Sequence, residues 1–169
     1  SKNKLEKKLG FSLNNPTILA TLHPLTLEYK DTLVHVDCFL GALKKLKVQV
    51  VFTYPNADTA GRIIIDKIDK FVSKYDWATV VVNFGQEGYF SMLNHASVMV
   101  GNSSSGIIES ASFDIPVVNI GDRQRGRIHS FNVIDVEYNQ NQIVKTIKKV
   151  MNSEFSKKLK GMKNPYGDG

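Results

Sequence analysis

The sequence predicts an α/β domain with a doubly wound parallel sheet of the Rossmann-like type. Short runs of β-branched and apolar residues alternate along the chain with segments whose apolar residues recur at helical spacing. One strand-like run, ATVVVN at 78–83, is mostly apolar, which is typical of a strand covered on both faces. Parallel strands need crossovers of a dozen or more residues, and the intervening helical segments supply them.

The elements follow one another in a regular order. The first predicted helix places Val36, Phe39 and Leu43 at helical spacing, so one of its faces is expected to be buried. The second predicted helix has a natural N-cap in Asp58. The expected strands are 17–22, 48–53, 78–83, 97–100, 116–120 and 131–136, and the expected helices are 31–46, 58–75, 88–96, 105–113 and 140–151.

Length and composition limit the class of protein. With 169 residues, the chain has room for one ordinary domain or for one half of a two-domain enzyme. Its 42 % hydrophobic and 22 % charged residues exclude disordered, collagen-like and coiled-coil proteins. The single cysteine, Cys38, excludes an intrachain disulfide and is interpreted as a small buried hydrophobic residue. Because His35, His95 and His129 share no ligand spacing, we expect neither a metal nor a cofactor.

The net charge of +6 is concentrated at the two ends of the chain. Residues 1–8 carry +3 and residues 142–169 carry +5, which leaves −2 for the residues between them. Solvated lysines on helix faces explain such ends, so no nucleic-acid partner is predicted. No apolar run approaches the roughly 20 residues of a membrane span, and residues 1–10 lack a signal-peptide core. We therefore expect a cytoplasmic protein without a membrane partner, and we interpret the polar segment 156–169 as a domain edge.

The candidate binding residues follow the predicted strands. In an open parallel sheet, ligands bind beyond the carboxyl ends of the strands, so these segments are expected to form one edge of a crevice. They are residues 23–24, 54–58, 83–88, 101–106 and 121–127.

The segment GNSSSG at 101–106 carries the most information among them. Small hydroxyls and backbone N–H groups at the start of a helix are typical of a phosphate or pyrophosphate site, which would consist of Ser103, Ser104, Ser105 and Gly106. Neither a Walker loop nor the dinucleotide fingerprint is present. Glu109 falls one turn into the predicted helix, where it can accept hydrogen bonds from a ribose diol. The alternative is a polar turn with a serine cap and a glutamate that stabilises the helix dipole.

Three arginines and one histidine lie in neighbouring segments. One of Arg123, Arg125 and Arg127 can offset pyrophosphate charge by a forked contact, although a solvated turn is the alternative. His23 ends the first strand and precedes Pro24, which keeps its backbone extended. Such a histidine can donate to a phosphate or transfer a proton, and the alternative is a structural role.

Three aromatic residues follow the third predicted strand. Phe84, Tyr89 and Phe90 are possible contacts of a nucleotide base, because aromatic rings can stack on it. Phe90 fits the hydrophobic core equally well.

Several motifs occur in order along the chain, namely LHPLT, YPNAD, GNSSSGIIESASFDIPVVNIGDRQRGR and YGDG. Together they resemble the hydrolysing UDP-N-acetylglucosamine 2-epimerases of sialic-acid and related nonulosonic-acid synthesis. The resemblance extends over nearly all of the chain. Its specific part is GNSSSG followed by Glu, Pro and GDRQ-x-GR, since the HP dipeptide alone would be weak.

This resemblance implies half of a two-domain GT-B-type fold, in which the active site lies between two Rossmann-like domains. Residues 1–169 correspond to the carboxyl-terminal, nucleotide-binding domain of that fold. The resemblance places the acid and base carboxylates in an amino-terminal domain outside this sequence, and a closing helix beyond YGDG. We therefore expect the chain alone to be inactive, and the resemblance implies a homo-oligomer for the full-length protein.

The same resemblance implies roles for individual residues and a reaction. UDP is eliminated across C1 and C2 of UDP-N-acetylglucosamine, and water then adds to the glycal-like intermediate to release N-acetylmannosamine. The implied ligands are UDP and a UDP-N-acetylhexosamine, either UDP-N-acetylglucosamine or a 4-acetamido-4,6-dideoxy relative. The implied residues are Ser103 and Ser104 on the pyrophosphate, Glu109 on the ribose, Arg123 facing the nucleotide, His23 as the catalytic histidine, and a PN-x-D element of Asn56 and Asp58, with Asn56 grouped among the nucleotide-binding residues.

Two other classes of function remain open from the sequence. A UDP-sugar glycosyltransferase of the same fold would also hold a nucleotide sugar, and it would transfer the sugar to an acceptor instead of releasing it with water. A non-catalytic nucleotide-binding module is the second alternative.

Overall fold

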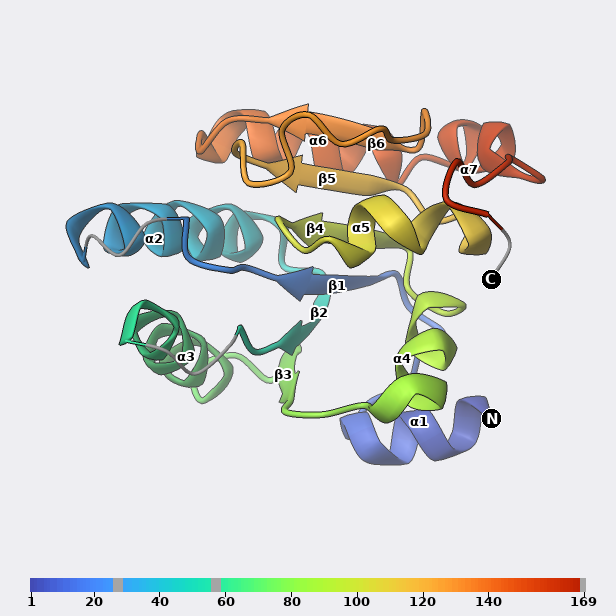
Figure 1. Cartoon of the computed structure of the whole chain (residues 1–169). Helices are drawn as coiled ribbons and strands as arrows, with labels where there is room; N and C mark the ends of the chain where they lie inside the picture. The colour runs from blue at the N-terminus through green and yellow to red at the C-terminus, as the bar shows by residue number, and fades with distance from the viewer. Residues whose placement is uncertain (26–28, 56–58, 168–169) are drawn as a thin grey trace.

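The computed structural model describes residues 1–25, 29–55 and 59–167, and its centre is a six-stranded parallel sheet (Figure 1). The strand order is β3-β2-β1-β4-β5-β6, and every neighbouring pair is parallel. This arrangement confirms the predicted doubly wound α/β class. The strands are β1 (Thr17–Thr21), β2 (Gln49–Thr53), β3 (Ala78–Val81), β4 (Val98–Gly101), β5 (Val117–Ile120) and β6 (Val133–Val136).

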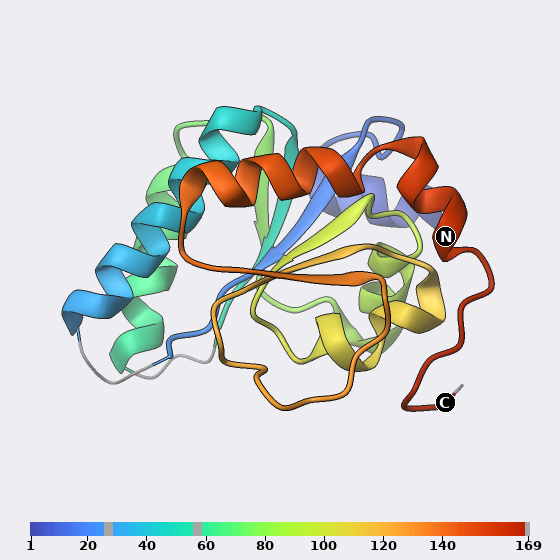
Figure 2. The same ribbon diagram turned by 90° about the horizontal axis from the view of Figure 1, so that it is seen from above.

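Helices cover both faces of the sheet (Figure 2). One face carries α2 (Tyr29–Leu46), α3 (Thr59–Val72) and α6 (Gln140–Val150). The other face carries α1 (Lys2–Leu9), α4 (Gly85–Leu93), α5 (Ser105–Ile108) and the 3₁₀ helix η1 (Ser110–Phe113), and α7 (Ser153–Leu159) packs against α6. No helix in the described ranges is both long and apolar enough to span a membrane.

Each face of the sheet has its own hydrophobic core, and β1 contributes to both. Ile18 and Ala20 pack into the core beneath α2, α3 and α6, whereas Leu19 packs into the core on the opposite face. All five residues of β1 are buried. Successive side chains of a strand point to opposite faces, so a strand covered on both sides needs apolar residues at every position.

Two helices at the ends of the chain were not among the predicted elements. Both have largely polar sequences, but each has a local cap, and α1 buries two leucines whereas α7 buries one. In α1, Leu5 and Leu9 are buried, and the Glu6 carboxylate accepts a hydrogen bond from the Leu13 N–H, which lowers the pKa of Glu6. The interpretation of 156–169 as a bare domain edge is therefore incomplete, because α7 runs to a buried Leu159.

The continuous helix predicted at 105–113 is wrong, because the segment is interrupted. It consists of a single α-helical turn, α5, followed by the 3₁₀ turn η1. The hydroxyl of Ser110 donates to the Gly106 carbonyl at 2.6 Å and also accepts from the Asn132 side chain. Serine side chains that bond to a preceding turn bend or interrupt helices, and Asp114 then ends the segment in the left-handed conformation. Asp58, the predicted cap of α3, lies outside the described residues, and Cys38 is partly buried.

The carboxyl ends of β1 and β4 meet at the point where the strand order reverses. Gly101, the last residue of β4, has φ of +137°, and a Cβ added there would lie 1.8 Å from the Thr21 carbonyl oxygen. The Thr21 carbonyl also accepts the N–H of Asn102 at 3.1 Å. Only glycine permits this approach, so residue 101 brings the loop after β4 against the end of β1.

We expect Gly101→Ala to lower the free energy of unfolding by at least about 2 kcal/mol, because it combines a disfavoured φ with a clash against backbone. Gly126→Ala is the control, since Gly126 also has a positive φ but no heavy atom lies within 4 Å of its added Cβ. The control should cost only about 1 kcal/mol. Urea unfolding measures the free energy of unfolding of both variants. If the two substitutions lowered it equally, the contact with Thr21 would not constrain residue 101.

Candidate functional site

The buried side chain of Asn102 joins the two loops at the centre of the sheet edge. It is 0 % exposed, its Oδ1 accepts the backbone N–H of His23 at 2.7 Å, and its Nδ2 donates to the His23 carbonyl at 2.8 Å. The side-chain amide therefore pairs with both the N–H and the carbonyl of the His23 backbone, in the way that a residue of a neighbouring strand pairs. This paired contact fixes the histidine backbone directly beside the serine loop.

The backbone carbonyl of Asn102 holds a third loop, the one that follows β5. It accepts hydrogen bonds from Arg123 Nη1 at 3.1 Å and from Gln124 Nε2 at 2.8 Å. Burial and the nearby charge of Arg127 lower the pKa of Arg123 from its ordinary value, but a guanidinium stays charged at any physiological pH. Arg123 thus presents a fixed positive charge next to the serine loop.

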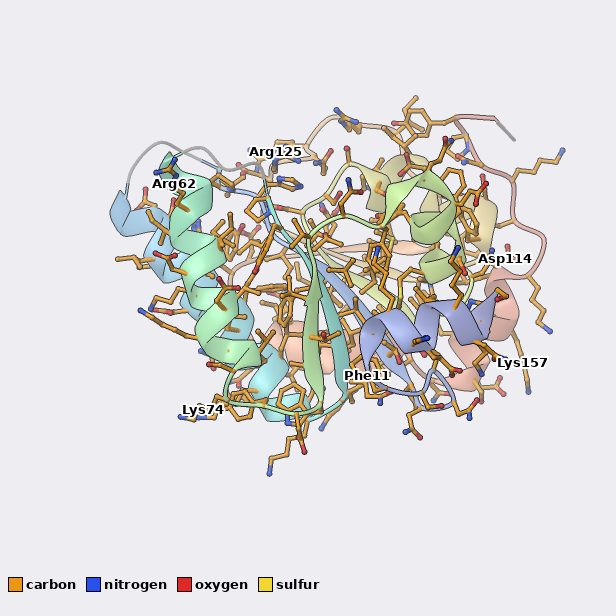
Figure 3. All side chains as sticks on the ribbon, turned by 90° about the horizontal axis from the view of Figure 1, so that it is seen from below. Phe11, Arg62, Lys74, Asp114, Arg125 and Lys157 are labelled. Atoms are coloured by element: carbon orange, nitrogen blue, oxygen red, sulfur yellow. The ribbon has the colours of Figure 1, made fainter. Side chains whose placement is uncertain are left out.

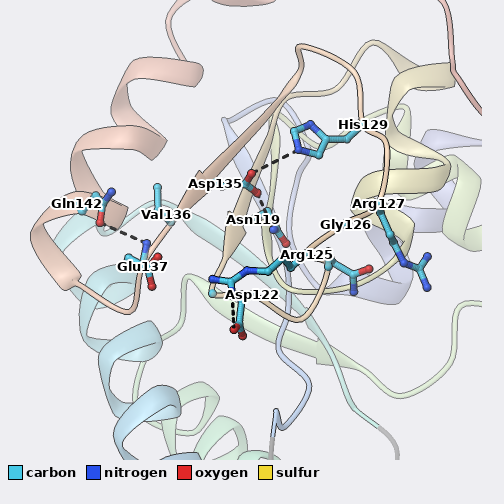
Figure 4. A pocket seen from close by; sticks show the side chains of 12 residues that line it. Asn119, Asp122, Arg125, Gly126, Arg127, His129, Asp135, Val136, Glu137 and Gln142 are labelled. Atoms are coloured by element: carbon cyan, nitrogen blue, oxygen red, sulfur yellow. Dashed lines mark hydrogen bonds and ion pairs between the residues drawn. The ribbon is translucent and has the colours of Figure 1, made fainter.

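The other two arginines of this loop border a second pocket, although the Arg127 charge is near enough to lower the pKa of Arg123. Arg125 and Arg127 line a separate pocket of about 300 Å³ beyond β5 and β6 (Figure 4). Arg125 lies 3.8 Å from the Asp122 carboxylate in an exposed ion pair. Figure 3 shows Arg125 and Arg62 on the edge where the strands end, and Lys74 on the opposite edge. Of the three candidates, only Arg123 is brought to the serine loop.

The serine loop keeps several hydrogen-bond donors free. The N–H groups of Ser105 and Gly106 bond to Ser103 within the turn, at 3.3 Å to its Oγ and 3.1 Å to its carbonyl. Within the described ranges, the N–H groups of Ser103 and Ser104 and the hydroxyl of Ser104 have no protein partner. Because α5 is only one turn long, these individual donors, and not a long helix dipole, make the loop suited to an anion.

Glu109 follows α5 directly and has an unsatisfied oxygen. Its Oε2 is buried and has no hydrogen-bond partner. The Glu109 charge helps to raise the pKa of the neighbouring Tyr89, although burial of the phenol is the larger cause, and together they raise it to about 12. A buried acceptor without a donor costs free energy, so this carboxylate is suited to a ligand with hydroxyl groups.

A cleft of about 420 Å³ opens beside the serine loop, between the ends of β1, β2 and β3. His23, Ser103 and Ser105 line it together with the aromatic residues Phe84 and Tyr89. The Tyr89 hydroxyl donates to Ser105 Oγ at 2.6 Å, which ties the aromatic wall to the serine loop. The cleft therefore combines hydroxyl, imidazole and aromatic groups.

The structure gathers most of the site residues predicted from the sequence, with two exceptions. Phe90 packs against Phe113 with a ring-centroid separation of 5.4 Å and does not line the cleft. Asn56 lies outside the described residues. In contrast, His23, Ser103 and Ser105 line the cleft, Arg123 bonds to Asn102 at the start of the serine loop, and Glu109 directly follows α5.

Three site residues were missed as individual candidates. Asn102 belongs to the quoted motif, but no sequence signal distinguishes a buried clamp from a polar loop residue. Gln124 is 4 % exposed, and it is buried only because its amide reaches the Asn102 carbonyl. Tyr138 packs its ring on His35 with centroids 3.8 Å apart, and its hydroxyl lies 3.5 Å from Asn102 Nδ2.

The other histidines are separated from one another. His95 contacts the Ser91 carbonyl, and His129 lies 3.4 Å from the Asp135 carboxylate. The part of the chain that the structure describes contains no group of three or more His, Cys, Asp or Glu side chains that could hold a metal ion.

Sequence comparison places the chain among sugar-nucleotide epimerases. The family model described as UDP-N-acetylglucosamine 2-epimerase matches residues 1–169. A Campylobacter jejuni GDP/UDP-N,N'-diacetylbacillosamine 2-epimerase (hydrolyzing) is 40 % identical over 92 % of this chain and 40 % of its own length. The polysialic acid biosynthesis protein P7 of Escherichia coli is 34 % identical over 98 % of this chain and 42 % of its own length. The chain thus spans about two fifths of these relatives.

Comparison with solved structures shows the same fold. A Staphylococcus aureus MnaA–UDP complex has a TM-score of 0.74 at 16 % identity, covering 100 % of this chain and 44 % of that one. An Escherichia coli ADP-heptose heptosyltransferase II has a TM-score of 0.64 at 12 % identity, covering 90 % of this chain and 51 % of that one. At such identities the likeness shows the fold alone, which is the Rossmann-like half of a GT-B architecture.

We expect Asn102→Ala to lower the free energy of unfolding by about 2–3 kcal/mol and to change the NMR shifts of the His23 imidazole and the Arg123 guanidinium. The reason is that the side-chain amide holds the backbone of His23, and without it the loop whose backbone carbonyl accepts from Arg123 is free to shift. Asn132→Ala is the matched control, because Asn132 is equally buried and donates to Ser110 and Ile115 instead. If Asn102→Ala leaves both sets of shifts unchanged, Asn102 does not hold these loops together.

Proposed function

This chain belongs to the UDP-N-acetylglucosamine 2-epimerase family, and on that basis we propose that it is the UDP-sugar-binding domain of a hydrolysing 2-epimerase. The observation that carries the proposal is the convergence of free donors and one fixed cation at the loop after β4. The N–H groups of Ser103 and Ser104 have no protein partner among the described residues, and the guanidinium of Arg123 bonds to the carbonyl of Asn102, the residue that precedes them. A diphosphate needs this set of donors.

In this proposal Glu109 binds the ribose hydroxyls. Its unpartnered buried oxygen lies one turn after the serine loop, at the end of α5. A carboxylate that accepts from both hydroxyls of a ribose forms two charge-assisted hydrogen bonds. Binding also removes the free-energy penalty of the unsatisfied acceptor. The acidic side chain therefore favours a nucleotide over inorganic diphosphate.

The base packs against the aromatic residues of the cleft in this proposal. Phe84 and Tyr89 line the cleft, with ring centroids 6.2 Å apart. The exposed side chain of Val82 adds an apolar contact at the end of β3. A uracil ring can stack on an aromatic face and leave its polar edge in water. Phe90 has no part in this contact.

The proposed reaction is elimination of UDP followed by addition of water. Negative charge develops on the leaving diphosphate, and preorganised N–H donors and Arg123 stabilise it without reorganisation. His23 lines the cleft near the same loop, where it can donate a proton or a hydrogen bond to the leaving group. Removal of the sugar C2 proton needs a base, which we assign to a domain outside these 169 residues.

The hydrolysing outcome and the pathway are supported by relatives. Two of them are named hydrolysing diacetylbacillosamine 2-epimerases, from Campylobacter jejuni and Legionella pneumophila, and a third is named for polysialic acid biosynthesis. We propose that the parent protein serves the synthesis of a sialic-acid-type sugar in the cytoplasm, with UDP-N-acetylglucosamine or a 4-acetamido-4,6-dideoxy relative as its substrate.

The first test compares UDP with uridine by titration calorimetry. We expect the chain to bind UDP at least about tenfold more tightly, since only UDP reaches the serine loop and Arg123. Arg123→Ala should bring the affinity for UDP toward that for uridine. Arg125→Ala is the control and should leave both affinities unchanged, because Arg125 lines the other pocket. Equal affinity of the unsubstituted chain for UDP and uridine would remove the phosphate site.

The second test addresses the ribose. Glu109→Gln should weaken UDP binding by about 1–2 kcal/mol through the loss of charge-assisted hydrogen bonds, with little change in thermal stability. Glu137→Gln removes the same charge from the pocket beyond β6 and serves as control. A large drop in melting temperature together with unchanged UDP affinity would assign Glu109 a structural role instead.

A further inference from the structure

Lys8 reaches from α1 to the loop that follows β3. Its Nζ donates to the Asn83 carbonyl at 2.6 Å and lies 5.4 Å from the centroid of the Phe84 ring. The two partners are 75 residues away in sequence or further. The charge pattern alone presents Lys8 as one of several solvated lysines, so these contacts give it a specific position.

Phe84 also packs near the Tyr89 ring and against the hydrophobic core on the α1 and α4 face of the sheet. Asn83 Oδ1 accepts the Gly85 N–H at 2.7 Å, and Gly85 has φ of +64°. Phe84 is the N-cap of α4, but its side chain cannot cap the helix. The bond from Lys8 is the long-range hydrogen bond that holds the carbonyl of the peptide immediately before Phe84.

Phe84 separates two cavities. It lines both the cleft beside the serine loop and a groove of about 580 Å³ between α1 and α4. Lys8 lines the groove but not the cleft. Lys8 therefore contacts Phe84 from the groove, while Phe84 also borders the cleft.

We propose that Lys8 is a positioning residue that holds Phe84 against the base of a bound uridine nucleotide. The proposal rests on the proposed function, because it takes the cleft as the nucleotide site. Lys8 fixes the peptide through the Asn83 carbonyl and the ring through its charge, and a cation over one face strengthens the packing of that ring. Selectivity for the nucleoside part of the ligand then depends on α1, a helix with no other contact to the cleft.

The test measures three ligands by NMR titration: UDP, uridine and inorganic pyrophosphate. Lys8→Met keeps most of the aliphatic stem but removes the charge and the donor. We expect this substitution to lower the affinities for UDP and uridine by the same factor, about three- to tenfold, and to leave the affinity for pyrophosphate unchanged. Lys7→Met is the matched control, since Lys7 is an exposed lysine in the same last turn of α1 and makes neither contact.

A second variant separates positioning from simple charge. Lys8→Arg keeps a donor and a cation that can lie over the ring, so it should retain UDP affinity within about twofold. The Phe84 ring shifts should move in Lys8→Met but not in Lys7→Met. If Lys8→Met lowered the affinities for pyrophosphate and uridine equally, Lys8 would act only as a long-range charge. If Lys8→Met kept the full affinity for UDP and uridine, the role of Lys8 would be wrong, but the proposed nucleotide site would stand. If the unsubstituted chain bound neither uridine nor UDP, the proposed function would fail as well.

Discussion

The site depends on one buried amide. Asn102 contributes its side chain to His23 and its carbonyl to Arg123 and Gln124, so a single residue connects the loops after β1, β4 and β5. Removing one partner would leave buried donors and acceptors unsatisfied, which costs more than the bonds themselves contribute. The relative positions of the His23 backbone, the serine loop and the guanidinium are therefore set before any ligand arrives, as the proposed stabilisation of a leaving group requires.

The fold places this amide where a nucleotide can be bound. The strand order reverses between β1 and β4, so the loops that follow them diverge to opposite faces of the sheet and leave a crevice between them. Two hydrophobic cores hold the sheet rigid on both sides. Gly101 then lets the end of β4 approach the Thr21 carbonyl, and Thr21 and Thr53, which both line the cleft, share a hydroxyl hydrogen bond.

Sequence patterns predicted the sheet and the serine loop for physical reasons. Strands covered on both faces must be apolar at successive positions, and a loop rich in Gly and Ser after such a strand is typical of close backbone approach, to a ligand or to another part of the chain. The same patterns missed α1 and α7, whose lysine-rich sequences bury only a few side chains such as Leu5 and Leu159. They also missed the role of Asn102 and the break after α5, because both depend on partners distant in sequence.

The central claim is that the loop after β4, held by Asn102, binds the diphosphate of a uridine nucleotide. A crystal structure of the chain with UDP tests it most directly. The account predicts diphosphate oxygens within hydrogen-bond distance of the Ser103 and Ser104 N–H groups and of Arg123, with the ribose hydroxyls on Glu109. A diphosphate found instead among Arg125, Arg127 and His129, in the pocket beyond β5 and β6, would contradict it.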